Sequence, residues 1–489
     1  MGKIAKQSIQ TSLYSYVGVV IGFFNVLWLY PYAFDPSELG IFRTIQDLGL
    51  LFVPFAQLGL GHGITRYFPR LKDNQSAFLS YSLLISLVGF AAVALMFFGF
   101  KSQIIALFAV NSPEIIDFLG VVLLITLFAL LNSILDAYSR SYIKVAVPTF
   151  FREVFLRLLT SVLVAFYLLQ WISFDQVMLG LALVYLSALV GMLVYLIWLG
   201  VLKFDLSWQS FPSGFRSSFV KFSLVTFLGT AASTLIMKID SIMVTSMISL
   251  EANAVYTIAF SMALVIEMPR RAISQVVMPV IADHFANKEH SPIDQLYKQV
   301  AKRQFYVCLL LFLLIVTNLD SIYHFIPNRE IYEAGRNVVI LIGLGKLIDV
   351  VFSANSEILV FSKYYKFNLF LTVVMSGLII LFNFLLIPIY GIEGAAGASV
   401  LVILLFNLMK FSFLKYRLGF NPFSWEIFRI AIAGLFSGVY SLDFGMSPLV
   451  SIVVNSLFVL AKFGFMSMLL EVGHEEWNWI QKKIKKSGS

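Results

Sequence analysis

Long apolar runs separated by short polar breaks dominate the pattern of the chain. A helix needs about 20 residues to cross the hydrocarbon core of a bilayer. Cutting the chain at its polar, proline- and glycine-containing breaks predicts fourteen membrane-spanning helices, near 10–31, 41–63, 77–99, 115–138, 149–170, 176–201, 219–245, 253–276, 303–320, 337–358, 367–388, 393–413, 427–441 and 448–470. The pattern therefore predicts an all-α integral membrane protein.

The positions of the charged residues predict the orientation of these helices. If the N-terminus is cytoplasmic, most of the 35 lysines and arginines fall in inner loops or at inner helix ends, among them Arg66, Arg140, Lys410 and the basic stretch 481–486. The opposite turns carry mainly acidic residues. Because cytoplasmic loops are enriched in lysine and arginine, we expect both termini in the cytoplasm. The longest inner loop, 270–303, is expected to contain an interfacial helix.

Composition agrees with a membrane protein and excludes several functions. The 489 residues are 59% apolar and 13% charged, whereas a soluble domain is about 25% charged. The formal net charge of +8 is explained by the inner loops rather than by a nucleic-acid partner. With Cys308 as the single cysteine, an intrachain disulfide or a cysteine metal cluster is excluded. The sequence has no Walker motif and no metal-ligand spacing. We expect a secondary transporter without a catalytic site, metal or cofactor.

A weak internal repeat suggests how the helices are grouped. Residues 38–45 (ELGIFRTI) align with 251–258 (EANAVYTI) at an offset of 213, and both acids lie in outward turns. Six spans followed by six in the same orientation indicate a parallel duplication with a substrate site between the halves. The predicted division is a first lobe at 1–202, a second lobe at 203–418, and two further helices with a basic tail at 419–489.

Three predicted spans carry polar stripes, although an ionisable residue near the bilayer centre costs about 2.5–3.5 kcal/mol. At helical spacing, each stripe lies on one face of its span, and together the stripes are expected to line a central, water-accessible cavity. The candidate cavity residues, which include Arg66 and Glu267 near inner helix ends, are Arg43, Gln46, Asp47, Gln57, Arg66, Lys238, Asp240, Glu267, Lys346 and Asp349.

Structural roles compete with binding roles at several of these positions. Arg43 and Asp47 are four residues apart and Lys346 and Asp349 are three apart, so that each pair can neutralise itself along one helix. Glu267 can pair locally with Arg270 or Arg271. Arg66 is also explained by an inner helix end, from which its side chain reaches the membrane surface.

Three groups of residues resemble a known family of transporters. The first is 37–42 (SELGIF) with 58–66 (LGLGHGITR), the second is 238–240 (KID) with 254–256 (AVY) and 278–282 (MPVIA), and the third is 383–397 (NFLLIPIYGIEGAAG). Their order and spacing are similar to those of the multidrug/oligosaccharidyl-lipid/polysaccharide (MOP) flippase superfamily. Within it, they resemble the Wzx-type flippases of polysaccharide and O-antigen units.

This resemblance implies two pseudo-symmetric six-helix lobes around a central cavity, with two additional C-terminal helices. It also implies the substrate, an undecaprenyl-pyrophosphate-linked oligosaccharide moved across the bacterial inner membrane for lipopolysaccharide or other surface polysaccharide. Arginine and lysine would neutralise the pyrophosphate and glutamine would bond sugar hydroxyls, while acidic residues would orient the cations or couple transport to Na⁺ or H⁺. Membrane lipids, a polysaccharide polymerase and glycosyltransferases are the implied partners.

Three other functions remain open from the sequence. A lipid II flippase would share the architecture and differ in its cargo. An ion-coupled antiporter of drugs or organic cations would use the buried acids, although that branch usually has twelve spans. A membrane polymerase or ligase is disfavoured because every predicted outward loop is short.

Overall fold

The computed structural model describes residues 3–71, 74–207, 211–438, 445 and 447–473. These residues form helices and connecting turns without a β-strand. The predicted basic stretch 481–486 lies outside the described residues. By packing, the chain divides into unit 1 (Met1–Ala254) and unit 2 (Val255–Ser489). The lobe boundary predicted at 202/203 refers to the duplicated helices and stays a prediction.

Unit 1 contains eleven α-helices and four shorter helical segments among its described residues. They are α1 (Lys3–Phe24), the π-helical η1 (Asn25–Leu29), α2 (Tyr30–Ala33), α3 (Pro36–Gln57), α4 (Leu60–Tyr67), η2 (Phe68–Arg70), α5 (Gln75–Gly99), α6 (Lys101–Phe108), η3 (Pro113–Phe118), α7 (Leu119–Ser141), α8 (Ala146–Thr149), the π-helical η4 (Phe150–Phe155), α9 (Leu156–Leu168), α10 (Phe174–Trp198) and α11 (Phe215–Met247). The next helix, α12 (Leu250–Leu264), begins in unit 1 and ends in unit 2.

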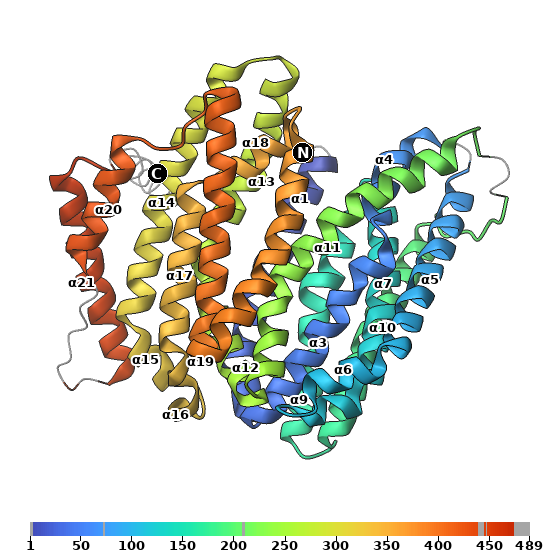
Figure 1. The fold of residues 1–489 in the computed structure, drawn as a ribbon, viewed down its shortest axis with the longest axis horizontal. Helices are drawn as coiled ribbons and strands as arrows, with labels where there is room; N and C mark the ends of the chain where they lie inside the picture. The colour runs from blue at the N-terminus through green and yellow to red at the C-terminus, as the bar shows by residue number, and fades with distance from the viewer. Residues whose placement is uncertain (1–2, 72–73, 208–210, 439–444, 446, 474–489) are drawn as a thin grey trace. The chain divides into compact units, whose positions relative to one another are not determined.

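Helix α3 packs against α5, α7 and α11 (Figure 1). Its start is fixed by a capping box, in which the Asp35 side chain accepts from the Glu38 N–H at 2.8 Å and the Glu38 side chain accepts from the Asp35 N–H at 3.2 Å. Such a box satisfies two backbone donors that the helix itself leaves open. Farther along, Thr126 on α7 donates to the carbonyl of Gly49. Helix α3 is therefore held at both its start and its middle.

The predicted span 41–63 is wrong as a single helix. The chain leaves the helical conformation at Leu58 and Gly59, where φ is +52° and +72°, and α4 begins at Leu60. A Cβ atom at Gly59 would lie 2.1 Å from the carbonyl oxygen of Ser223 on α11. Glycine permits both this close approach and the positive φ. The break thus lets α4 pack closely on α11.

Unit 2 holds the remaining described helices. They are η6 (Val265–Glu267), α13 (Met268–Ala286), α14 (His290–Thr317), α15 (Leu319–His324), α16 (Arg329–Tyr332), η7 (Glu333–Gly335), α17 (Arg336–Val351), α18 (Asn355–Phe361), α19 (Tyr365–Leu418), α20 (Trp425–Ser437) and α21 (Pro448–Leu469). A buried apolar cluster that includes Ile281, Tyr297, Ile358 and Leu414 joins α13, α14, α18 and α19.

The segment 270–303 is helical over most of its length, and the interfacial position expected for a helix in it stays a prediction. Helix α13 continues to Ala286 and α14 already starts at His290, so only Asn287–Glu289 separates them. The two extensions pack on each other through apolar residues such as Ile281 and Ile293, both almost fully buried. On α13, Val276, Met278 and Val280 remain exposed, an apolar surface of the kind that an interfacial helix places among lipid headgroups.

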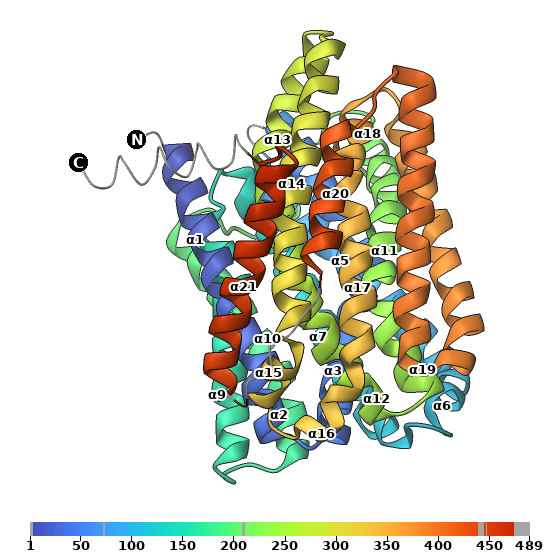
Figure 2. The same cartoon turned by 90° about the vertical axis from the view of Figure 1, so that its left-hand side faces the viewer.

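Helix α19 is a pair of helices with a kink between them. At Gly391 the backbone is non-helical, with φ +59° and ψ −136°, and Figure 2 shows the two legs side by side. A Cβ atom at Gly394 would lie 2.3 Å from the carbonyl oxygen of Leu386. Small residues let the turn close at this point. The predicted segments 367–388 and 393–413 correspond to the two legs.

Ten helices in the described part of the chain are long and apolar enough to cross a membrane, or eleven if the pair α17 and α18, bent by 48°, is one span. This establishes a multi-pass membrane protein. Each of the fourteen predicted segments lies on helix in the described residues, some with breaks and the thirteenth as far as Ser437. The number of fourteen spans itself stays a prediction.

Candidate functional site

In unit 1, an ion pair joins two of the predicted spans. The Lys238 ammonium on α11 lies 2.6 Å from the Asp47 carboxylate on α3, although the two residues are 191 positions apart. The side chain of Asp47 is 5% exposed and that of Lys238 is 26% exposed. The expected alternative, in which Asp47 pairs with Arg43 on the same helix, is therefore replaced by a pair between helices.

Arg43 and Gln46 contribute to a neighbouring hydrogen-bonded group. The Arg43 guanidinium donates to the Gln46 side chain at 3.3 Å, and the Gln46 amide donates to the Tyr185 hydroxyl on α10 at 3.2 Å. Two residues before Gln46, Thr44 accepts a hydrogen bond from Asn253 at 2.9 Å. These bonds link α3 to α10 and to the start of α12. Every acceptor in this group is a neutral side-chain oxygen.

The remaining unit 1 candidates lie apart from this ion pair. Gln57 donates to Ser133 on α7 at 3.0 Å. Arg66 is exposed and its guanidinium lies 4.2 Å from the centre of the Phe222 ring, a cation–π contact. Asp240 is buried on α11, two residues after Lys238. The structure thus connects Asp47 with Lys238 and Arg43 with Gln46, and it places Gln57 and Arg66 in separate surroundings.

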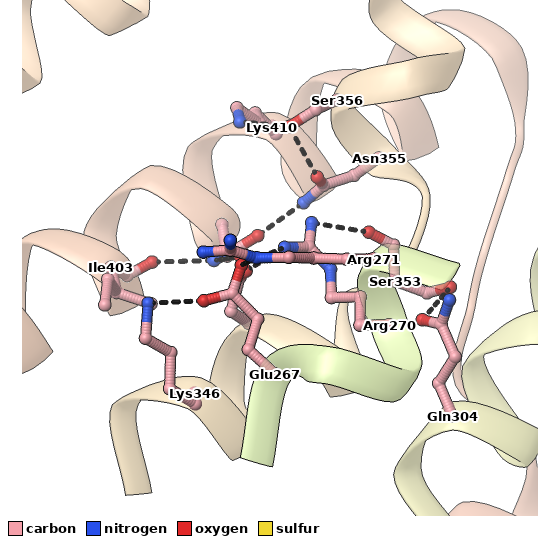
Figure 3. Close-up of polar contacts among 12 residues, drawn as sticks. Glu267, Arg270, Arg271, Gln304, Lys346, Ser353, Asn355, Ser356, Ile403 and Lys410 are labelled. Carbon is pink, nitrogen blue, oxygen red and sulfur yellow. Dashed lines mark hydrogen bonds and ion pairs between the residues drawn. The ribbon is translucent and has the colours of Figure 1, made fainter. Parts of the chain in front are cut away.

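In unit 2, three cations surround one carboxylate (Figure 3). The Lys346 ammonium lies 2.6 Å from Glu267 Oε2, and Arg271 Nε lies 3.1 Å from Glu267 Oε1. Arg270 Nη1 is 4.0 Å from the same carboxylate. The side chain of Glu267 is only 12% exposed, whereas that of Arg271 is 56% exposed. The group is therefore buried around Glu267 and reaches the surface at Arg271.

Arg270 joins this carboxylate to a second one. Its guanidinium forms an ion pair and a hydrogen bond with Asp349 on α17, and its Nη2 donates to the backbone carbonyl of Ser353 at 3.5 Å. Lys346 and Asp349 were expected to neutralise each other at three residues' spacing. Instead, each pairs with a residue of the segment that contains η6 and α13.

A chain of hydrogen bonds extends from Asp349 into the protein. Asn407 on α19 donates to Asp349 at 2.9 Å, and Asn355 on α18 donates to Asn407 at 2.6 Å. Ser356 then donates to Asn355 at 3.3 Å, and Lys410 donates to Ser356 at 2.6 Å. We call these residues the unit 2 cluster: Glu267, Arg270, Arg271, Lys346, Asp349, Asn355, Ser356, Asn407 and Lys410.

Two helix interruptions bring these side chains together. The short η6 turn places Glu267 between α12 and α13. Across from it, the chain bends between α17 and α18, where Ser353 has a φ of +51°. A bend of this kind frees backbone groups that a straight helix would use internally, and the Ser353 carbonyl is the one that Arg270 contacts. Interrupted helices that supply both side-chain and backbone ligands are typical of transporter binding sites.

The sequence identified part of this cluster. Glu267, Lys346 and Asp349 were predicted site residues, and Arg270 and Arg271 were considered only as local partners of Glu267. Lys410, Asn407 and Asn355 were missed. One signal was available, because Asn407 and Lys410 are three residues apart within an otherwise apolar stretch and so share a helix face.

The charges of the unit 2 cluster suit an anion better than a metal. Three cations, Arg270, Arg271 and Lys346, stand against the two carboxylates of Glu267 and Asp349, an excess of one positive charge. Within the described residues, no group of three or more His, Cys, Asp or Glu side chains is placed to hold a metal ion. Carboxylates already bound by guanidinium and ammonium groups can be exchanged for the oxygens of a phosphate.

The chain resembles known proteins in structure rather than in sequence. It matches no protein-family model and no curated protein sequence. A structure of the lipid II flippase MurJ in an inward closed conformation superimposes with a TM-score of 0.72 and 16% identity, and the match covers 94% of this chain and 99% of that one.

Two other structures show the same likeness. An inward-facing multidrug resistance MATE transporter of the MOP superfamily gives a TM-score of 0.62 at 14% identity, over 84% of this chain and 94% of that one. A MOP transporter from Pyrococcus furiosus, described as having a binding pocket of reverse polarity, gives 0.57 at 12% identity, over 85% and 95%. The resemblance predicted from the sequence is confirmed at the level of architecture: this chain has the fold of MOP superfamily transporters.

Proposed function

We propose that this chain is a flippase that moves an undecaprenyl-pyrophosphate-linked oligosaccharide from the inner to the outer leaflet of the bacterial cytoplasmic membrane, for the synthesis of surface polysaccharide. The likeness to a lipid II flippase over 94% of the chain supports a lipid-linked cargo. The sequence resemblance to polysaccharide-unit flippases supports an oligosaccharide on that lipid. Both termini are proposed to be cytoplasmic, and a polymerase and glycosyltransferases are the proposed partners in the pathway.

The excess of cations in the unit 2 cluster is the observation that carries this proposal. Arg270, Arg271 and Lys346 converge on the Glu267 carboxylate from three positions. Guanidinium groups match the geometry of phosphate oxygens and ammonium groups add a point charge, so the same three side chains can hold a pyrophosphate. Because Arg271 is more than half exposed, an anion has a side from which to approach.

The other candidate residues take supporting roles in the proposal. Arg43 and Arg66 are further contacts for the anion as it passes unit 1, and Gln46 and Gln57 bond sugar hydroxyls. The carboxylates of Asp240, Glu267 and Asp349 orient the cations or take part in coupling to Na⁺ or H⁺, whereas Lys238 and Asp47 hold α11 against α3 as a structural pair. A central cavity between the two predicted lobes is the proposed path of the cargo.

Two other functions are supported by a specific observation each. The likeness to MurJ equally supports lipid II as the cargo, because lipid II is also a lipid-linked saccharide. The likeness to MATE transporters supports an ion-coupled efflux of drugs or organic cations. The excess of positive charge in unit 2 argues against a cationic cargo, since like charges in a site of low dielectric repel strongly.

Reconstitution into liposomes tests the proposal. The purified full-length chain is inserted into vesicles that contain a fluorescent undecaprenyl-pyrophosphate oligosaccharide, and the exposure of the probe in each leaflet is followed with and without Na⁺ and H⁺ gradients. We expect protein-dependent movement of this probe. Parallel vesicles with fluorescent lipid II and with an organic-cation dye identify the alternatives, and efflux of the dye without movement of either lipid would overturn the proposal.

A further inference from the structure

We propose that Lys410 is a proton-binding site whose protonation state is passed along a hydrogen-bond chain to the Arg270–Asp349 ion pair and thereby sets how tightly unit 2 holds an anion. The identity of that anion as a lipid pyrophosphate rests on the proposed function. The proton site itself rests on the surroundings of Lys410 alone.

Lys410 is buried and carries its charge without a carboxylate in contact. The residue is 2% exposed. Its Nζ lies 2.6 Å from Ser356 Oγ and 3.2 Å from the centre of the Phe406 ring. None of the ion pairs formed among the described residues includes Lys410. Burial removes the hydration of the ammonium, which makes its charge unfavourable. The Ser356 hydroxyl and the Phe406 ring replace only part of that hydration. The ammonium and the neutral amine are both realistic states here.

The chain of hydrogen bonds from Lys410 has a single direction. Lys410 donates to Ser356, Ser356 to Asn355, Asn355 to Asn407, and Asn407 to the Asp349 carboxylate. Every donor therefore points from the ammonium toward the carboxylate. Bonds aligned in this way polarise one another, so that a change at one end is felt at the other.

When Lys410 loses its proton, the alignment of these hydrogen bonds toward Asp349 is no longer favoured. A neutral Lys410 amine has a lone pair and accepts a hydrogen bond from the Ser356 hydroxyl. Ser356 then no longer donates to Asn355, and the Asn355 amide polarises Asn407 less strongly. Asn407 stays attached to the Ile403 carbonyl at 2.9 Å, but its bond to Asp349 weakens. With a weaker bond from Asn407, Asp349 is held more by Arg270, and the pair becomes harder for an incoming anion to open.

The charged groups around Lys410 agree with a proton rather than Na⁺ as the bound ion. Three charged groups lie near enough to interact electrostatically with Lys410: Asp349 on α17, Glu357 on α18 and Arg270 on α13. Glu357 Oε2 is buried without a hydrogen-bond partner in the described residues, so a carboxylate is available near the ammonium. The carboxylates of Glu267 and Asp349 already form ion pairs with Lys346 and Arg270. Na⁺ would have to displace these two cationic side chains.

Anion binding and proton binding are then linked in both directions. An anion at Arg270 and Lys346 adds negative charge near Lys410 and favours its ammonium form. By reciprocity, the ammonium form favours the anion by the same factor. The structure therefore predicts that anion affinity falls as the pH rises.

The first test measures protons without any cargo. The purified full-length chain and the variant Lys410→Met are titrated in detergent between about pH 6 and about pH 9. We expect the wild-type chain to release about one proton more than the variant. Lys415→Met is the matched control, because Lys415 is an exposed lysine on the same helix, five positions away. Equal release by wild type and Lys410→Met overturns the proposal, whatever the chain transports.

The second test measures the linkage, with inorganic pyrophosphate as the probe. Wild-type affinity is expected to be about tenfold higher near pH 6 than near pH 9. Pyrophosphate itself changes charge over this range, so the informative quantity is the difference between wild type and variants. Lys410→Arg, which stays charged, should keep the high affinity throughout, and Lys410→Met should keep the low affinity.

Ser356→Ala separates the proton site from the hydrogen-bond chain. This variant should still release the additional proton, because Lys410 is unchanged, and should lose the dependence of anion affinity on that proton. A purely structural role for Ser356 would instead alter proton release and affinity together. If the wild-type pH response persists in Lys410→Met, the linkage is wrong. If proton release and pyrophosphate affinity behave as expected but the lipid-linked oligosaccharide does not move in liposomes, only the proposed cargo is overturned.

Discussion

The two units place their membrane-embedded charges in different ways. In unit 1, the Lys238–Asp47 ion pair joins α11 to α3, and Arg43 and the buried Asp240 add one charge of each sign. In the unit 2 cluster, three cations surround two carboxylates on η6, α13 and α17. The first arrangement is balanced, whereas the second has an excess of positive charge.

This difference indicates which unit recognises an anion. A balanced pair such as Lys238–Asp47 joins two helices and leaves no charge to be satisfied by a ligand. An anion that binds to a cluster with surplus cations neutralises the remaining positive charge. Without the anion, the carboxylates of the cluster neutralise only part of that charge. The repeated topology suggested by the sequence therefore carries a structural pair in one unit and a candidate binding site in the other.

The largest expected effect concerns Asp349. Replacing it by leucine leaves Arg270 buried without its main partner, since the Arg270 side chain is 14% exposed. We expect a loss of about 3–5 kcal/mol in the free energy of unfolding, measured by denaturant titration in detergent. The matched change in unit 1, Asp47→Leu, should cost roughly half as much, because Lys238 is 26% exposed and can reach water.

A double substitution sharpens this comparison. Asp349→Leu combined with Arg270→Met removes both charges and should recover most of the lost stability, because neither charge remains buried and unpaired. Equal losses for the single and double variants would show that packing, rather than charge, holds these helices together.

An intermediate effect is expected at close backbone contacts, one in each unit. A Cβ atom at Gly40 would lie 2.2 Å from the Leu250 carbonyl, and one at Gly394 would lie 2.3 Å from the Leu386 carbonyl. Gly40→Ala and Gly394→Ala should each cost about 1–3 kcal/mol. The control variants Gly120→Ala and Gly397→Ala meet nothing within 4 Å and should be neutral or slightly stabilising. Thermal unfolding of the four variants checks this, and a tolerated Gly394→Ala would contradict the tight turn in α19.

The smallest effect is expected for local ion pairs between residues that are close in the sequence. Glu333 pairs with Arg329 in unit 2, and Glu153 pairs with Arg157 in unit 1, both four residues apart. Glu333→Gln and Glu153→Gln should each change the free energy of unfolding by less than about 1 kcal/mol. Similarly small changes in the free energy of unfolding in both units would show that the two units differ only in their interhelical charges. A large loss for either variant would show that a local pair also contributes to the contrast.

The helices were largely readable from the sequence, whereas their breaks were not. Where a long apolar run predicted a membrane-spanning segment, the described part of the chain is helical. The bend at Phe352–Ala354 has neither glycine nor proline to announce it, and Leu58 takes a positive φ that leucine rarely adopts. These conformations are imposed by packing and by side chains from other helices, which a local pattern does not contain.

The site was predicted in its residue types but not in its pairs. Lys238 and Asp47 are 191 positions apart, and Arg270 and Asp349 are 79 apart. Spacing along one helix favoured the local pairs Arg43–Asp47 and Lys346–Asp349, because those are the only neighbours that periodicity reveals. Lys410 was assigned to an inner helix end by its sign, and only the three-dimensional packing shows its burial.

The central claim is that unit 2, rather than the balanced pair of unit 1, holds the anionic part of the cargo. The most direct measurement is the initial rate of movement of a fluorescent undecaprenyl-pyrophosphate oligosaccharide in liposomes, for Lys346→Met and for the double variant Lys238→Met with Asp47→Asn. We predict a loss of at least about tenfold for Lys346→Met, corresponding to about 1.4 kcal/mol, and a change within about twofold for the double variant. A rate that survives in Lys346→Met and falls in the double variant would contradict the account.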